Sequence, residues 1–84
     1  MNKTIYSRQS ESVRRKIVEL RSKAELTQRD LATKLGRERS LIARLELGER
    51  RLDVVEFFWL CRACNADPVK EAANLMRQLD SPQP

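Results

Sequence analysis

An all-α fold of five helices is the prediction for this chain, and three observations lead to it. Apolar residues recur at the three- and four-residue spacing of amphipathic helices. No run of β-branched residues alternates with the period of two that is typical of strands, and only two glycines and three prolines occur. A length of 84 residues allows one small domain with a modest core. We expect an arm at residues 1–9, a domain at residues 10–80 and a frayed tail at residues 81–84.

The N-terminal part of the chain is expected to be a mobile arm followed by one helix. Residues 1–9 lack helical periodicity, and either Lys3 and Arg8 reach along DNA or the apolar residues of the arm pack on the domain. The helix is expected from about Glu11 to Lys23, with Ser10 as its N-cap. Its inner face is predicted to hold Val13, Ile17, Leu20 and Ala24. Most of its basic residues, among them Arg14, Arg15, Lys16 and Lys23, are assigned to a solvated face.

Two short helices joined by a tight turn are expected within residues 26–48. Thr27 is a good N-cap residue and Asp30 follows three residues later, so the first of these helices is expected over residues 28–35. Gly36 then fits a left-handed position that ends the helix. The second helix is expected over residues 39–47, with Ile42 and Leu45 facing inward. Such a pair with a short glycine-containing turn is typical of DNA-binding helix-turn-helix motifs.

Seven residues of this stretch fall at positions shared by one known family of helix-turn-helix proteins. They are Gln28, Ala32, Gly36, Ile42, Leu45, Glu46 and Gly48. The stretch therefore resembles the lambda-repressor-like (Cro/repressor, XRE-type) family, and the resemblance extends from Ile17 to about Val69. It implies a five-helix DNA-binding domain in which Arg21 pairs with Glu46. It also implies that Gln28 holds a DNA phosphate, whereas the alternative is an ordinary polar residue in the first turn.

The helix over residues 39–47 is the expected recognition helix, whose N-terminal part would enter the major groove. Arg39, Ser40, Ala43 and Arg44 form its outward face. Arg39 and Arg44 are candidates for reading bases, because arginine pairs bidentately with guanine, although a phosphate contact is the alternative for each. Ala43 is a candidate for contact with a thymine methyl group. Further DNA contacts are expected from Thr27, Gln28, Arg37, Arg50 and Arg51, and a solvated loop is the alternative for the last two.

Glu38 departs from the family pattern, which usually has Ser or Thr at this N-cap position. Glutamate is a poorer cap and brings a negative charge close to the expected phosphates. Three roles remain open for it. It caps the recognition helix, pairs with Arg37, or accepts a hydrogen bond from a cytosine amino group.

The C-terminal part is expected to form two more helices and to provide a dimer interface. One helix follows the N-cap Asp53 and reaches Asn65, with Val54, Phe57, Leu60, Cys61 and Cys64 on its core face. Its other large apolar residues, Val55, Phe58 and Trp59, are predicted to form a homodimer interface. The alternative is that the last helix or the arm covers them. That last helix begins at Asp67 and Pro68, and its expected apolar stripe is Val69, Ala72, Ala73, Met76 and Leu79.

Charge is distributed unevenly along the chain. Residues 1–52 hold 14 Lys/Arg and 7 Asp/Glu, a charge of +7, whereas residues 53–84 hold 3 Lys/Arg and 5 Asp/Glu, a charge of −2. The basic part coincides with the helix-turn-helix, as expected for a protein that binds phosphates.

Several function classes find no support in the sequence. The chain contains no histidine and only two cysteines, so it cannot supply a four-ligand zinc site, and Cys61 and Cys64 are predicted to be core residues. We expect no enzyme activity, no cofactor and no small-molecule substrate. No apolar run approaches the length of a membrane helix and no signal peptide is apparent, so a cytoplasmic location is expected.

The sequence therefore predicts a small homodimeric regulator that binds double-stranded DNA with sequence specificity and represses transcription. Two alternatives share the fold, namely a DNA-binding antitoxin and a restriction-modification controller. A third alternative is a protein-interaction module that uses the apolar surface of residues 54–80.

Overall fold

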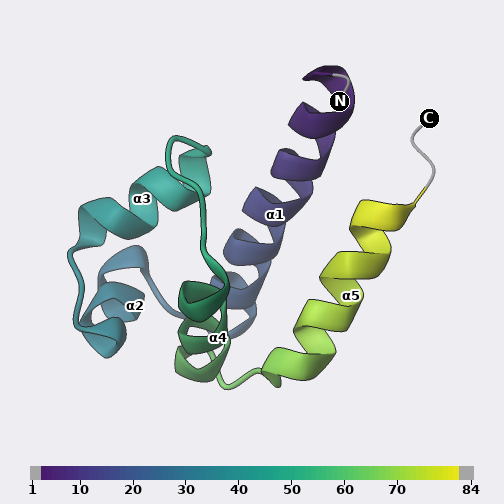
Figure 1. The fold of residues 1–84 in the computed structure, drawn as a ribbon. Helices are drawn as coiled ribbons and strands as arrows, with labels where there is room; N and C mark the ends of the chain where they lie inside the picture. Colours follow the sequence, from purple (N-terminus) through teal and green to yellow (C-terminus); the bar gives the residue numbers. More distant parts are fainter. Residues whose placement is uncertain (1–2, 82–84) are drawn as a thin grey trace.

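The computed structural model describes residues 3–81, and the side chains of residues 8–81. These residues form five α-helices and no strand, as predicted. The helices are α1 (Lys3–Lys23), α2 (Gln28–Leu35), α3 (Arg39–Leu47), α4 (Val54–Ala63) and α5 (Pro68–Asp80). Helix α1 packs against α3 and α5, while α4 packs against α2 and α5. Figure 1 shows α1 and α5 side by side and running in opposite directions, with α2 and α3 on the other side of α1. The ends of the predicted arm and tail, residues 1–2 and 82–84, lie outside the described residues.

Helix α1 begins at Lys3 rather than at about Glu11, so the expectation that residues 3–9 are not helical is wrong. Ser10 consequently lies inside the helix and is not its N-cap. Adding turns to an existing helix costs less free energy than nucleating one, so a weak sequence signal suffices there. A tertiary contact also supports this part of α1, because Gln9 Nε2 donates to the carbonyl oxygen of Leu79 at 3.2 Å.

The turn between α2 and α3 is built as the sequence predicts. The Thr27 hydroxyl accepts a hydrogen bond from the Asp30 backbone N–H, and the Asp30 carboxylate accepts one from the Thr27 N–H, each at 3.0 Å. At the other end of α2, Gly36 adopts a left-handed φ of 66°. The Arg37 N–H then donates to the Ala32 carbonyl oxygen at 2.9 Å, which satisfies a terminal carbonyl of the helix.

The remaining helix ends also follow local signals. Helix α3 ends at Gly48, whose φ of 77° is left-handed. Asp53 and Glu56 form a reciprocal capping box at the start of α4. Asn65 is left-handed after α4, with a φ of 57°. Asp67 accepts hydrogen bonds from the first turn of α5, where Pro68 is the first residue.

One core joins α1, α2, α3 and α4. Its buried members are Ile17, Leu20, Leu31, Ala32, Leu41, Ile42, Leu45, Leu60, Cys61 and Cys64, and Val13, Ala24 and Phe57 pack against it half-buried. The assignment of Val54 to this core is wrong, because its side chain is 85% exposed. The buried stripe of α4 starts at Phe57, and Val54 in the first turn of the helix lies beyond it.

The predicted apolar stripe of α5 is also partly wrong. Leu75 is the buried residue of this helix, whereas Val69 and Met76 are exposed. Glu71 lies one turn before Leu75 on the inward side of α5 and accepts a hydrogen bond from Lys16 Nζ at 3.0 Å. Lys16 is only 3% exposed and also reaches Glu19 at 3.3 Å, so its assignment to a solvated face is wrong. Hydrogen bonds from Lys16 to these two carboxylates raise the pKa of Lys16 against the opposing effect of burial.

Candidate nucleic-acid interface

Helix α3 has a polar face open to solvent and an opposite face in the core. Arg39, Ser40 and Arg44 are exposed, and Ala43 is half-buried. The buried residues of the helix are Leu41, Ile42, Leu45 and Glu46. The fold therefore brings the four predicted recognition residues to one side of α3, with Ala43 less accessible than the others. Two guanidinium groups and a hydroxyl are hydrogen-bonding groups of the kind that reads base edges.

A buried carboxylate anchors the C-terminal end of α3. Glu46 is 7% exposed and accepts hydrogen bonds from Arg21 Nε at 2.6 Å and Arg21 Nη2 at 3.0 Å. Arg21 Nη1 also donates to the carbonyl oxygen of Leu26 at 2.9 Å, and the bonds to Glu46 raise the pKa of Arg21. The pair between Arg21 and Glu46 that the resemblance implied is confirmed. It ties α1 to the end of α3.

Gln28 connects this anchor to the beginning of α3. Its Nε2 donates to Glu46 Oε1 at 2.9 Å, and its Oε1 accepts from Arg39 Nη1 at 3.2 Å. Gln28 therefore links Arg39, the first residue of α3, to the buried carboxylate of Glu46. A phosphate contact by Gln28 stays a prediction. The hydrogen bond that its side chain accepts orients Arg39.

A polar hollow of about 470 Å³ lies beside the start of α3. It is lined by Gly36, Arg37, Glu38, Ser40, Leu41, Arg44 and Arg50. Three arginines around one hollow suit an anion such as a backbone phosphate. Glu38 holds the N-cap position without a side-chain bond to the helix backbone, and its carboxylate lies 3.5 Å from the Ser40 hydroxyl. Of its three predicted roles, capping by the side chain is wrong, since a glutamate is longer than the residues that cap well.

Arg37 and Arg50 both pair with the carboxylate of Glu56, a residue that the sequence did not indicate as part of this site. Glu56 accepts two hydrogen bonds of 2.8 Å from Arg50, and Arg37 Nη1 lies 3.7 Å from Glu56 Oε2. Arg37 therefore pairs with Glu56, and the predicted pair between Arg37 and Glu38 does not form. Hydrogen bonds from Arg50 lower the pKa of Glu56. The three-residue spacing from Asp53 to Glu56 is typical of a capping box, and this signal places Glu56 in the first turn of α4, close to the loop.

Arg14 was also assigned to the solvated face, but the structure gives it a role at α3. Its Nη1 donates to the Glu46 carbonyl oxygen at 3.1 Å, and its other donors bind Glu11. A cation beside the last carbonyls of a helix is favourable. The hydrogen bond from Arg14 lowers the pKa of the half-buried Glu11 to about 2. No spacing rule links Arg14 to α3, so sequence alone could not reveal this contact.

The predicted interface residues of α4 form an exposed apolar surface. Val55, Phe58 and Trp59 are 64%, 39% and 57% exposed, so neither α5 nor the described part of α1 covers them. The Phe58 and Trp59 rings meet edge to face with centroids 5.0 Å apart. The exposed Val54 adds to them, and we call these four residues the α4 patch.

The two cysteines are free and buried, as predicted. Burial raises the pKa of Cys61 to about 11, which makes its thiol unreactive at neutral pH. Among the described residues, no group of three or more His, Cys, Asp or Glu side chains is arranged to hold a metal ion. Within the same residues, no helix combines the length and apolar character needed to cross a membrane.

The braced α2–α3 pair, the exposed polar face of α3 and the surrounding arginines define a helix-turn-helix DNA-binding domain. Comparison with known proteins agrees. The family model described as helix-turn-helix domain matches residues 14–74. Among solved structures, the chain is similar to an XRE-family like protein from Pseudomonas syringae pv. tomato str. DC3000, with 38% identity and a TM-score of 0.82. The match covers 90% of this chain and 93% of that one. No curated protein matches the sequence. The chain belongs to the XRE-type helix-turn-helix family and is a DNA-binding regulator.

Proposed function

We propose that this protein is a homodimeric transcriptional repressor that binds a specific DNA sequence in the cytoplasm and blocks a promoter. The observation that carries the proposal is the chain of hydrogen bonds from Arg39 through Gln28 to the buried Glu46. Because Arg39 is oriented before DNA arrives, less side-chain entropy is lost on binding. A preoriented arginine on an exposed helix face suits recognition of guanine O6 and N7.

The proposed contacts divide into those that read bases and those that bind the backbone. Arg39 and Arg44 read bases, Ser40 adds a hydrogen bond, and Ala43 touches a thymine methyl. Backbone phosphates are bound by Thr27, Gln28, Arg37, Arg50 and Arg51. The free N–H groups at the start of α2 favour a phosphate there. The charge of +7 on residues 1–52 supports the same division, because phosphate contacts dominate affinity.

The proposed dimer joins two α4 patches. Four exposed apolar side chains on one short helix are costly to leave in water, and contiguous apolar surface of this kind marks interfaces. Dimerisation would present two copies of α3 to one face of the duplex, with half-site centres about 34 Å apart. We propose that Val55, Phe58 and Trp59 carry most of this contact, since large aromatic residues dominate interface energetics.

Selection of bound duplexes from a random pool tests this function. The expected result is an enriched site with two inverted half-sites, about one helical turn apart. A pool that shows no enrichment after repeated rounds would refute sequence-specific binding. An enriched single half-site bound by a monomer would refute the dimer and assign the α4 patch to a different protein partner.

A further inference from the structure

The carboxylate of Glu56 is held in place at the start of α4. Its Oε1 accepts a hydrogen bond from the Asp53 backbone N–H at 3.0 Å, which is one half of the capping box. The same carboxylate accepts two hydrogen bonds of 2.8 Å from Arg50, an arrangement that fixes geometry as well as adding energy. The Glu56 side chain is 17% exposed and that of Arg50 is 32% exposed, so the arginine is the more accessible member of the pair. The helix end therefore fixes the carboxylate, and the carboxylate fixes Arg50.

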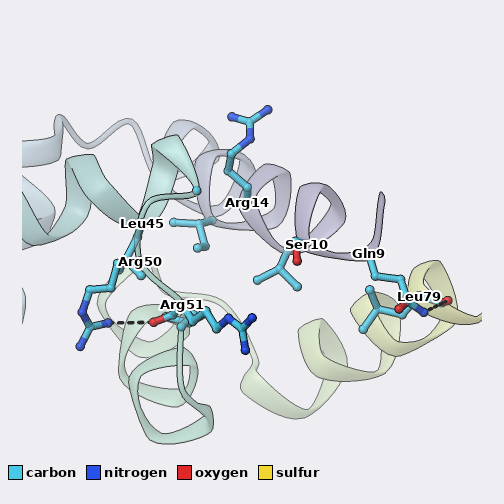
Figure 2. Close-up of a pocket in the computed structure, with 11 residues that line it drawn as sticks. Gln9, Ser10, Arg14, Leu45, Arg50, Arg51 and Leu79 are labelled. Carbon is cyan, nitrogen blue, oxygen red and sulfur yellow. Dashed lines mark hydrogen bonds between the residues drawn. The ribbon is translucent and has the colours of Figure 1, made fainter. Parts of the chain in front are cut away.

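The Arg50 guanidinium keeps an edge for a further ligand. Its Nη1 donates to the Arg51 carbonyl oxygen at 3.0 Å and to Glu56 Oε1, and its Nη2 donates to Glu56 Oε2. Figure 2 shows the bond to the Arg51 carbonyl oxygen and the guanidinium pointing away from Leu79 of α5. These bonds do not use the Nε–H and the second N–H of Nη2, which lie along one edge of the planar group. Such an edge suits a phosphate, which accepts two parallel hydrogen bonds from arginine.

The Glu56 carboxylate connects arginines from both ends of the recognition helix. Arg50 belongs to the loop after α3, whereas Arg37 belongs to the turn before it and has its Nη1 3.7 Å from Glu56 Oε2. Both arginines line the polar hollow beside the start of α3, together with Arg44 and Glu38. Three positive charges and one negative charge therefore lie around the hollow, and Glu56 holds two of the positive charges.

We propose that Glu56 is a positioning residue for DNA binding, which keeps Arg37 and Arg50 oriented to bind the DNA backbone at the hollow. The inference rests on the proposed function, in which both arginines bind phosphates. A long flexible side chain loses conformational freedom when it binds, and a side chain that is already held loses less. Glu56 thus favours DNA binding although its own charge has the sign of a phosphate.

Two effects of Glu56 on DNA binding oppose each other. Its charge repels a phosphate, but the bound Arg50 offsets that charge, and salt screens it beyond about 8 Å at physiological ionic strength. The ordering of Arg50 is an entropic gain that salt does not screen. For one long side chain this gain corresponds to about two- to tenfold in affinity.

A double-mutant cycle on the full chain tests the positioning role, with affinity for the selected duplex measured at physiological salt. Its members are the wild type, Glu56→Gln, Arg50→Ala and the double variant. Glutamine keeps the size and the capping ability of Glu56 but cannot offer two acceptor oxygens to a guanidinium. We expect Arg50→Ala to cost about two- to tenfold more affinity in the wild type than in Glu56→Gln, because only the wild type holds Arg50 in place. A uniform effect of the lost charge cancels, since both members with Glu56→Gln carry it.

Glu49→Gln is the matched control, because it removes the same charge from an exposed residue of the same loop. The cost of Arg50→Ala should be the same in this background as in the wild type. Equal costs in the wild type and in Glu56→Gln would overturn the positioning role. A larger cost in Glu56→Gln would also overturn it, since Glu56 would then compete with the phosphate. No duplex binding by the wild type would refute the proposed function and this inference together, whereas binding without coupling would refute this inference alone.

NMR relaxation of the Arg50 Nε–H group in the DNA-free protein gives a second test that does not need Arg50→Ala to fold. We expect a high order parameter in the wild type and in Glu49→Gln, and a lower one in Glu56→Gln. The same order parameter in all three proteins would show that Glu56 does not hold Arg50 and would overturn the inference.

Discussion

The α2–α3 half and the α4 half of the molecule have surfaces of opposite chemical character, one polar and one apolar. In the first, the exposed Arg39 is tied through Gln28 to Glu46 and Arg21, so a polar surface is held in place by the core. In the second, large apolar side chains such as Trp59 are exposed to solvent, the Trp59 ring meets the Phe58 ring edge to face, and the Arg62 guanidinium lies over the Phe58 ring. The comparison shows that one small domain carries two different surfaces, a polar one that is hydrogen-bonded to the core and an exposed apolar one that we propose as the dimer interface.

Substitution of Glu46, the buried carboxylate that anchors the first surface, should have the largest effect. In Glu46→Ala the buried part of Arg21 and the Gln28 amide lose their acceptor, so we expect the free energy of unfolding to fall by about 3–5 kcal/mol. Urea denaturation of the purified variant measures this loss. Glu49→Ala, which removes an exposed carboxylate of the following loop, is the control and should cost less than about 0.5 kcal/mol. A loss below about 1 kcal/mol in Glu46→Ala would show that the anchor is not structural.

The second surface is broken by Trp59→Glu. A charge in the proposed dimer contact should raise the dimer dissociation constant more than about 100-fold, equivalent to about 3 kcal/mol. Analytical ultracentrifugation across a concentration range measures the change. Leu47→Glu places the same charge at an exposed apolar site outside the α4 patch and should sediment like the wild type. Identical sedimentation of all three proteins would count against α4 as the interface.

Within the first surface, Arg39 and Arg50 should make different kinds of DNA contact, so their substitutions should have different effects on sequence preference. Arg39→Ala should cost about 1–3 kcal/mol on the preferred duplex and relax the sequence preference, because it removes a base contact. Arg50→Ala should weaken binding to all duplexes alike, because a phosphate contact carries no sequence information. Affinities for matched and mismatched duplexes at one fixed salt concentration separate the two. Unchanged discrimination in Arg39→Ala would contradict the base-reading role.

The smallest expected effect concerns acid stability. The pKa of Glu56 is lower in the folded chain, chiefly through the hydrogen bonds from Arg50, than its unfolded value of about 4.3. Its contribution to stability is therefore complete above that value and is lost as the pH falls through the folded pKa. Glu56→Gln keeps a residue that completes capping boxes but removes the charge. The difference in melting temperature between variant and wild type should therefore shrink between pH 7 and pH 3. A difference that stays constant would show that the charge of Glu56 contributes nothing.

The features that the sequence predicted correctly depend on residues that are close together in the chain. Thr27 with Asp30, the two glycines and Asp67 with Pro68 are local signals for helix ends, and all of them hold in the structure. The helical spacing of apolar residues in 13–24 also identified the inner face of α1, because a face repeats along one helix.

The features that sequence missed depend on residues far apart in the chain. Lys16 is buried because Glu71, 55 residues away, meets it from α5. On α5, Leu75 rather than Met76 faces inward, on the side of the helix that also carries Glu71. Arg14 at the end of α3 and the shared partner Glu56 are likewise products of packing between elements. Periodicity describes one helix at a time and carries no information on such pairings.

The most direct test of the central claim is affinity for the selected duplex and a scrambled duplex between 50 and 200 mM salt. We expect affinity for both duplexes to fall steeply, by about a thousandfold or more for six or more phosphate contacts in the dimer. We also expect the selected duplex to bind more tightly at every salt concentration. No measurable duplex binding at low salt, or equal affinity for the two duplexes, would contradict this claim.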